Sequence, residues 1–157
     1  MAGGHGSESA RLNVGFAEPT LRLTTEQYEV IVAHCYDGLP DEACGMLIGP
    51  LGDDGQPAGD VSTVMPCRNA DASAKSYRVD PRDVFRASRE AQANGHELIG
   101  AWHSHTHTDA YPSLTDVREA RDPTWVYAIV SLRHAEPSLR AYRIRNEKIE
   151  EVPVEVR

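Results

Sequence analysis

The stretch "HSHTHTDAYPSLTD", residues His103 to Asp116, holds three histidines and two aspartates within fourteen residues and has hardly any core-forming side chain. It directly follows the apolar run "ELIGAW", residues 97–102, which predicts a buried strand. From Ser113 onward, "SLTDVREAR" predicts a short helix with Ser113 as its N-cap. Side chains that can bind a ligand at the end of a buried strand indicate a functional site. The fold must therefore bring this strand, the loop after it and the short helix together.

His103 and His105 are two residues apart at the predicted strand end. Alternate side chains of a strand point the same way, so both imidazoles can face one point, as in a metal site. A catalytic zinc site has three protein ligands and one open position, and an aspartate is an acceptable third ligand. Asp116 lies in the first turn of the predicted helix and is the candidate. His107 has the same parity as the other two histidines, so spacing alone leaves it open as a replacement for either.

A metal-activated water also needs a group that accepts its proton and passes it to the leaving group. A carboxylate that does not bind the metal usually has this function. Glu42 stands at the start of the apolar run "ACGMLIG", residues 43–49, and is the candidate general base. Asp41 beside it satisfies the same argument, so the residue pattern does not separate the two.

Two longer helices are predicted outside this region. The first begins after Thr24, which forms a capping box with Gln27, and ends near Gly38. The second covers residues 81–94, with Asp80 as N-cap and Pro81 as its first residue. The side of this second helix that we expect to pack on the sheet is formed by Val84, Phe85, Ser88 and Ala91.

Apolar or alternating runs predict the strands. Besides residues 43–49 and the strand before His103, they lie at residues 21–23, 61–67, 76–79, 124–132, 139–144 and 148–156. Helices and strands in this order predict one mixed α/β domain, with a central, mostly antiparallel sheet flanked by helices.

Length and composition restrict the possible functions. The chain has 157 residues, enough for one domain, which we expect at residues 19–157 after a disordered N-terminal tail at residues 1–18. A net charge of -8 argues against nucleic acid as a partner. The sequence has no run of 18 apolar residues, which a membrane-spanning helix would need, and its N-terminus lacks the pattern of a secretory signal. We therefore expect a cytoplasmic protein. Three cysteines without C-x-x-C spacing indicate neither a disulfide framework nor a cysteine zinc site.

The quoted stretch also resembles a known motif. It reads as H-S-H, seven residues, then S-x-x-D, and "DEACGMLIG" supplies an upstream glutamate followed by a strand. Together they are similar to the motif of the JAMM (MPN+) zinc metallopeptidases, and the likeness extends over the chain from about residue 21. The resemblance implies a single JAMM/MPN-like domain that holds one Zn²⁺. By this resemblance, the zinc ligands are His103, His105 and Asp116. Glu42 is then the general acid/base, and Ser113 donates a hydrogen bond to the oxyanion. His107 becomes a neighbour of the site.

Within the family, the sequence is most similar to the short bacterial and actinobacterial members. Such enzymes remove a cysteine or a short C-terminal extension after the Gly-Gly end of a ubiquitin-like sulfur-carrier protein. The resemblance therefore implies a protein tail as substrate and a ubiquitin-like sulfur-carrier protein as partner. A homodimer is a further expectation, whereas neither nucleic acid nor a membrane is expected as a partner.

Three other functions are alternatives to this one. The same cut could mature a carrier protein for thiocarboxylate formation in natural-product or siderophore biosynthesis. A non-catalytic MPN scaffold is disfavoured because such proteins lack the metal ligands, which are all present here. A zinc deaminase would need H-x-E together with P-C-x-x-C, and "PCRN", residues 66–69, supplies only the first part of the second motif.

Overall fold

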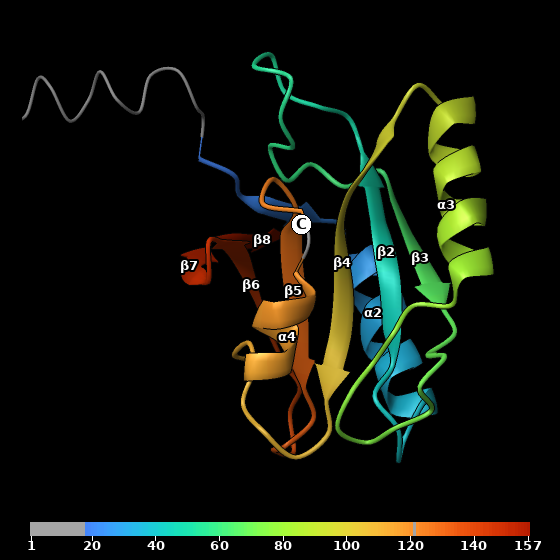
Figure 1. Ribbon diagram of the computed structural model, residues 1–157, viewed down its shortest axis with the longest axis vertical. Helices are drawn as coiled ribbons and strands as arrows, with labels where there is room; N and C mark the ends of the chain where they lie inside the picture. The colour runs from blue at the N-terminus through green and yellow to red at the C-terminus, as the bar shows by residue number, and fades with distance from the viewer. Residues whose placement is uncertain (1–17, 121) are drawn as a thin grey trace, which may run out of the picture.

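The computed structural model describes residues 18–120 and 122–157, so the tail expected at residues 1–18 lies almost entirely outside the described residues. A six-stranded sheet in the order β3-β2-β4-β5-β6-β7 forms the centre of the molecule (Figure 1). Its strands are β2 (Cys44–Gly49), β3 (Thr63–Cys67), β4 (Glu97–His105), β5 (Val126–Ser131), β6 (Ser138–Arg145) and β7 (Lys148–Val152). Within it only β4 and β5 pair in parallel, which confirms the mostly antiparallel sheet.

The last predicted strand, residues 148–156, is two strands in the structure. It is interrupted at Pro153, which has no N–H to donate to a ladder. β7 ends just before the proline, and β8 (Val154–Val156) instead pairs in parallel with β1 (Leu21–Leu23) as a separate two-stranded sheet. The last strand of the chain, β8, is therefore paired with β1, the first described strand.

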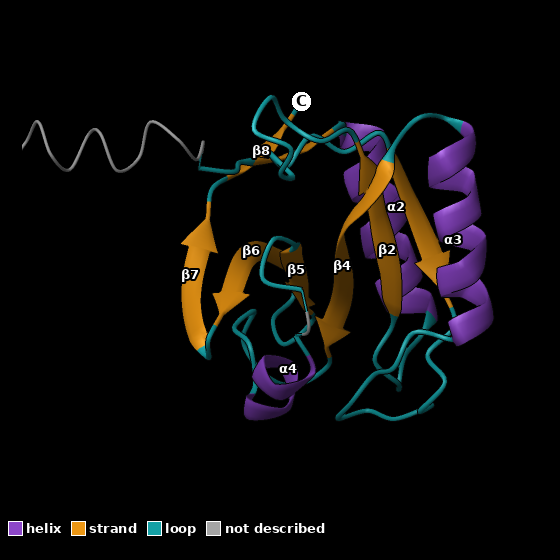
Figure 2. Ribbon diagram, turned by 45° about the horizontal axis from the view of Figure 1, so that its top comes forward, coloured by secondary structure: helices purple, strands orange, loops and turns teal. Residues whose placement is uncertain are grey.

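Helices cover both faces of the central sheet (Figure 2). α2 (Thr25–Asp37) packs on one face, where Ile31 and Cys35 join a core cluster around Trp102. α3 (Pro81–Ala93) and α4 (Leu114–Glu119) lie on the other face. The predicted caps of all three helices are present, with Thr24, Asp80 and Ser113 each accepting a backbone N–H bond. Local sequence therefore positions each helix start.

Residues 76–79 do not form a strand, in contrast to the prediction. Only an isolated bridge between Asn69 and Val79 is present. The side chain of Asn69 holds the loop instead: its amide donates to the carbonyls of Glu42 and Ser76, each at 3.0 Å, and its oxygen accepts the N–H of Arg78 at 3.0 Å. Side-chain hydrogen bonds thus add to the few backbone bonds that hold the segment leading to the site.

Phe85 is the second departure from the prediction. The buried residues of α3 are Ala87 and Ala91, whereas Phe85 is 64% exposed. A helix turns by about 100° per residue, so Phe85 lies about 200° around the axis from Ala87. The helix therefore packs on the sheet through small side chains and presents an aromatic ring to solvent.

Gly45 allows β2 to lie close to Trp102, its partner residue on β4. A Cβ added at this glycine would lie 2.2 Å from Trp102 Cε2 and 2.5 Å from the Met65 carbonyl oxygen. We expect Gly45→Ala to lower the free energy of unfolding by about 1–3 kcal/mol or more, because the core has no space for a methyl group there. Urea denaturation measures the effect, and the control Gln92→Ala, at an exposed position of α3, should change stability by less than about 0.5 kcal/mol. Equal stability of both variants would contradict the packing argument.

No helix among the described residues combines the length and apolarity that crossing a membrane would require.

Candidate functional site

The two histidines of the quoted stretch lie at the buried end of β4. His103 and His105 are 2% and 4% exposed. β4 is held on both sides there, since His103 is paired with Cys44 on β2 and with Ile129 on β5. His105 and its β5 partner Ser131 end the parallel ladder. The sheet thus fixes the backbone from which both imidazoles project.

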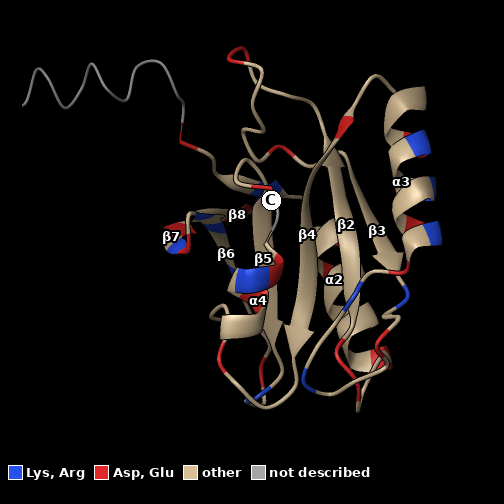
Figure 3. Ribbon diagram, in the orientation of Figure 1, with Lys and Arg blue, Asp and Glu red and all other residues tan. Residues whose placement is uncertain are grey.

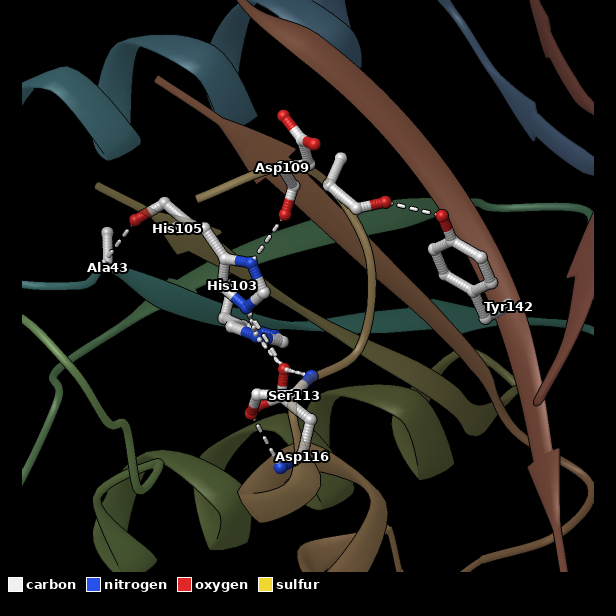
Figure 4. A network of polar contacts seen from close by, with 9 residues as sticks. Ala43, His103, His105, Asp109, Ser113, Asp116 and Tyr142 are labelled. Atoms are coloured by element: carbon white, nitrogen blue, oxygen red, sulfur yellow. Dashed lines mark hydrogen bonds and ion pairs between the residues drawn. The ribbon is translucent and has the colours of Figure 1, made fainter. Parts of the chain in front are cut away.

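α4 brings the carboxylate of Asp116 to the same point. The Ser113 hydroxyl accepts the N–H of Asp116 at 3.0 Å, and Asp116 Oδ2 accepts the N–H of Ser113 at 2.9 Å, a reciprocal capping box. The same Oδ2 atom lies 3.1 Å from His103 Nε2 and 3.0 Å from His105 Nε2 (Figure 4). The cap that starts the helix therefore also aims this carboxylate at the histidines.

The three ligand atoms fit a small divalent cation. His103 Nε2 and His105 Nε2 are 3.2 Å apart, close to their separations from Asp116 Oδ2. Tetrahedral zinc with bonds of 2.0–2.1 Å separates its ligands by about 3.3 Å. His105 Nδ1 donates to the carbonyl of Asp109 at 2.8 Å, which leaves the Nε2 lone pair free to bind a metal. The donor set and its spacing could therefore hold a small divalent metal ion.

Electrostatics favour an ionised aspartate between the histidines. Burial alone would raise the pKa of Asp116, but hydrogen bonds from His103 and His105 outweigh it and hold this pKa far below its usual range. Burial lowers the pKa of His103. Burial also opposes the charge on His105, yet its bonds to Asp116 and to the Asp109 carbonyl leave the pKa of His105 raised. A cation is thus favoured where the three side chains meet.

Glu42 is buried next to this group. It is 6% exposed, and its Oε1 atom has no hydrogen-bond partner among the described residues. Burial raises its pKa to about 7, with His105 lowering and Asp116 raising the value. The backbone around it is fixed, because the Glu42 N–H donates to the Ser73 carbonyl at 2.7 Å and the next N–H donates to Ser104 Oγ at 2.9 Å. A carboxyl group that titrates near neutrality is suited to accept and return protons.

Asp41 and His107, which spacing left open as alternatives, lie differently from Glu42 and the other two histidines. Asp41 is half-exposed, and it is Glu42 that interacts electrostatically with His105 and Asp116. His107 is exposed and does not belong to the group of possible metal ligands. The structure therefore places Glu42 beside the group of possible metal ligands and His107 outside it.

Tyr77 is a residue of the site that the sequence did not reveal. Its ring stacks on the imidazole of His103, with centroids 4.2 Å apart and an angle of 19° between the planes. Asp109 was also missed, since only its backbone carbonyl contacts His105. The loop around it is tied to β6 by the Tyr142 hydroxyl, which donates to the carbonyl of Ala110 (Figure 4). No residue spacing could have shown either contact, because both depend on loop conformation.

A cavity of about 770 Å³ adjoins the site. Tyr77 lines it and also covers His103, so the cavity and the metal group share this ring. Met46 and Ala101 of the sheet belong to its lining, together with Trp125 and Tyr127. The lining is largely apolar, and the cavity extends from the beginning of α3 to the end of α4.

Ser113 has a structural function that a mutation will expose. Ser113→Ala removes the acceptor of the Asp116 N–H, and loss of such a cap typically costs about 0.5–2 kcal/mol. We expect lower thermal stability and weaker zinc binding, because Asp116 loses its fixed position. Ser113→Thr keeps the hydroxyl and should restore both, as measured by calorimetry and zinc titration. Unchanged zinc affinity in Ser113→Ala would show that the cap does not position the ligand.

The comparison with family models decides the relationship. Residues 24–145 match the model described as prokaryotic homologs of the JAB domain. The chain belongs to the prokaryotic JAB family. A CysO-cysteine peptidase from Mycobacterium tuberculosis is 37% identical over 137 residues, which cover 87% of this chain and 90% of the relative. A desampylase from Haloferax volcanii is 30% identical over 116 residues, covering 71% and 80%. The similarity to the JAMM (MPN+) family expected from the motif is confirmed.

Solved structures agree with this JAB assignment. A protein from Desulfitobacterium hafniense has a TM-score of 0.78 at 34% identity, covering 88% of this chain and 93% of that one. A JAB1/MPN domain protein from Archaeoglobus fulgidus has a TM-score of 0.55 at 19% identity, covering 87% and 98%. The second likeness shows the fold alone, and together they confirm the expected JAB/MPN architecture.

Proposed function

We propose that this chain is a zinc metallopeptidase. It hydrolyses the peptide bond after the C-terminal Gly-Gly of a ubiquitin-like sulfur-carrier protein and releases cysteine or a short extension. One observation carries the proposal: a ligand group of two imidazoles and a carboxylate lies beside a buried glutamate whose Oε1 has no partner. Buried polar atoms are rarely left without a hydrogen bond unless they have a function, and activation of water would use this one.

His103, His105 and Asp116 would hold the zinc ion through the three atoms described above. When bound, zinc lowers the pKa of water and polarises a carbonyl oxygen. Glu42 removes the proton from the attacking water, because its pKa of about 7 lets it act as a base near neutral pH. The protonated Glu42 then donates to the departing amine, which completes the amide hydrolysis.

Ser113 would contribute a donor to the developing oxyanion. Its Oγ accepts the N–H of Asp116, and this leaves the hydroxyl proton available to a substrate. Loss of one such donor typically lowers turnover by about 10²-fold or more. Tyr77 keeps water away from one side of His103 by stacking on it.

Two relatives support the substrate class. The names CysO-cysteine peptidase and desampylase belong to proteins 37% and 30% identical to this chain. A Gly-Gly tail also fits the site physically, because a segment without side chains can approach a buried metal group most closely. The three cysteines are free and buried, as expected in a reducing compartment, which supports a cytoplasmic location as part of the proposal.

We propose that the tail binds as an added strand near β3 or the loop at residues 68–78. β3 is an edge strand of the sheet, so one of its sides is not paired with another strand and could receive an extended peptide. The loop lies next to both Glu42 and His103, through Asn69 and Tyr77 respectively. A tail added there would end close to the metal group. A complex with the tail bound along another edge would contradict this placement.

The decisive experiment uses the zinc-loaded protein and a carrier protein that ends in Gly-Gly-Cys. Mass spectrometry should show loss of one cysteine residue, and removal of zinc by a chelator should stop the reaction. A carrier ending in Gly-Gly-Cys-X tests whether a longer extension is released. An unchanged carrier mass in the presence of bound zinc would contradict the substrate assignment.

A further inference from the structure

The two histidines of the metal group are held in different ways. His105 Nδ1 donates to the Asp109 carbonyl at 2.8 Å, and this bond fixes the plane and the tautomer of the ring. The polar contacts of the His103 ring all lie at Nε2, on the side of Asp116 (Figure 4), and no described residue forms a hydrogen bond with its Nδ1. A histidine that binds a metal usually has a hydrogen bond at its second ring nitrogen, so the orientation of His103 needs another contact.

The sheet fixes the backbone of His103 but not the direction of its ring. Strand pairing holds this backbone between β2 and β5, yet the imidazole can still turn about its two side-chain bonds. No ion pair from these strands restrains it, because β2, β5 and the part of β4 after Glu97 carry no Lys, Arg, Asp or Glu (Figure 3). The orientation of the ring therefore depends on residues that other segments bring to it.

Tyr77 supplies such a contact from the loop at residues 68–78. Its ring lies nearly parallel to the imidazole of His103, at an angle of 19°, with the centroids 4.2 Å apart. The Tyr77 hydroxyl forms no hydrogen bond with a described residue, so the contact with the metal group is made by the ring. An imidazole bound to a metal ion shares the positive charge of the ion, and the face of an aromatic ring attracts positive charge. The stack therefore becomes more favourable when a cation binds.

One amide side chain holds the backbone on both sides of Tyr77. Asn69 Nδ2 donates to the carbonyl of Ser76 at 3.0 Å, and Asn69 Oδ1 accepts the N–H of Arg78 at 3.0 Å. The same Nδ2 also donates to the carbonyl of Glu42 at 3.0 Å. Asn69 therefore fixes the stacked ring relative to the backbone of the proposed base.

We propose that Tyr77 is a positioning residue, whose ring orients His103 for metal binding in place of the hydrogen bond that orients His105. This inference rests on the proposed function, because it concerns the same metal group, and it adds a residue outside the ligand set. Loss of a group that orients a metal ligand typically lowers metal affinity by about 10–100-fold. Tight zinc binding should therefore require an aromatic ring at position 77 but not its hydroxyl.

Three variants test the proposal. Tyr77→Leu removes the aromatic face and keeps an apolar side chain, and Tyr77→Phe keeps the face and removes only the hydroxyl. The control Tyr36→Leu makes the first change at a tyrosine of α2 that is 41% exposed. Zinc affinity is measured by titration against a competing chelator, and the geometry of the site by the visible absorption of the Co²⁺-substituted protein. Circular dichroism of the metal-free proteins establishes that each variant is folded.

We expect Tyr77→Leu to weaken zinc binding by about tenfold or more and to alter the Co²⁺ spectrum. Tyr77→Phe and Tyr36→Leu should bind zinc like wild type and keep its Co²⁺ spectrum. Turnover of a carrier that ends in Gly-Gly-Cys, measured at saturating zinc, should fall in Tyr77→Leu and recover in Tyr77→Phe. A loss of overall stability alone would leave the spectrum of the folded protein unchanged.

A measurement on the wild-type protein does not depend on how the variants fold. Nuclear Overhauser contacts between the ring protons of Tyr77 and His103 should be present in the metal-free protein and should persist after zinc is added. Their loss in the zinc-bound protein would overturn the proposal.

Wild-type zinc affinity and an unchanged Co²⁺ spectrum in folded Tyr77→Leu would also overturn it. The same holds if Tyr77→Phe weakens zinc binding as much as Tyr77→Leu does, because the hydroxyl and not the ring face would then act, or if Tyr36→Leu shows an equal loss. If the wild-type protein binds no zinc, the proposed function itself fails, and that result is distinct from zinc binding that is insensitive to the substitutions at Tyr77.

Discussion

Replacement of Glu42 by Gln is expected to abolish peptidase turnover while zinc remains bound. The amide is nearly isosteric with the carboxyl but cannot accept the proton of the attacking water, and general acid–base catalysis contributes about 10²–10⁴-fold to rate. The three proposed metal ligands lie on other residues and keep their positions. Single-turnover kinetics should show the loss in the chemical step, and elemental analysis should give one zinc per chain. Asp41→Asn is the control and should retain activity. Activity in Glu42→Gln would assign the base to another residue.

The same substitution should stabilise the metal-free protein at alkaline pH. The pKa of Glu42 is raised from 4.5 to about 7 by burial, so the folded state binds the proton more tightly than the unfolded state does. The stability that this proton contributes is fully present below pH 4.5 and is lost as the pH rises through 7. At pH 8, metal-free Glu42→Gln should therefore be more stable than wild type, by at most about 3 kcal/mol.

Denaturation of both metal-free proteins at pH 5 and pH 8 measures this difference. The advantage of the glutamine variant should be small at the lower pH and larger at the higher one. A pH-independent difference would mean that Glu42 titrates normally, and then burial could not explain its function as a base.

The second large effect concerns the choice between histidines. His105→Ala should lower zinc affinity by roughly 10³-fold or more, because a three-ligand site loses one imidazole. His107→Ala should keep zinc and most activity, since this side chain is exposed and outside the ligand group. Zinc titration against a competing chelator measures both. If His107→Ala emptied the site and His105→Ala did not, the ligand assignment would be wrong.

Local spacing predicted that His103, His105 and Asp116 lie together, but it left His107 open as a replacement ligand. A strand places His103 and His105 on one side, and a capping box at Ser113 orients Asp116, so each relation lies within a few residues. Glu42 was harder, because it is 61 positions from His103 in the sequence. Only the pairing of β2 with β4 brings the two together. The motif resemblance supplied the link that periodicity could not.

Other contacts could not be predicted from local patterns. The strand expected at residues 76–79 is a loop because the Asn69 side chain satisfies its backbone groups. Tyr77 reaches His103 only through this loop conformation. On α3, the prediction that Ala91 lies on the packed side is confirmed, but Phe85 is exposed and Ala87, which was not predicted, is buried. Hydrophobicity alone predicts that Phe85 is more buried than Ala87, whereas close packing of the helix on the sheet favours the small side chain.

The capping box of α4 joins metal binding to local folding. α4 has six residues, and so short a helix is not stable by itself in water. Asp116 Oδ2 both contacts the histidines and accepts the N–H of the N-cap residue Ser113, so a bound cation and an ordered α4 stabilise each other. Zinc affinity then includes the free energy of ordering this helix, and fraying of α4 becomes a route for release of the ion. Zinc should therefore slow hydrogen exchange at the Val117 amide, which donates to the Ser113 carbonyl at 3.0 Å.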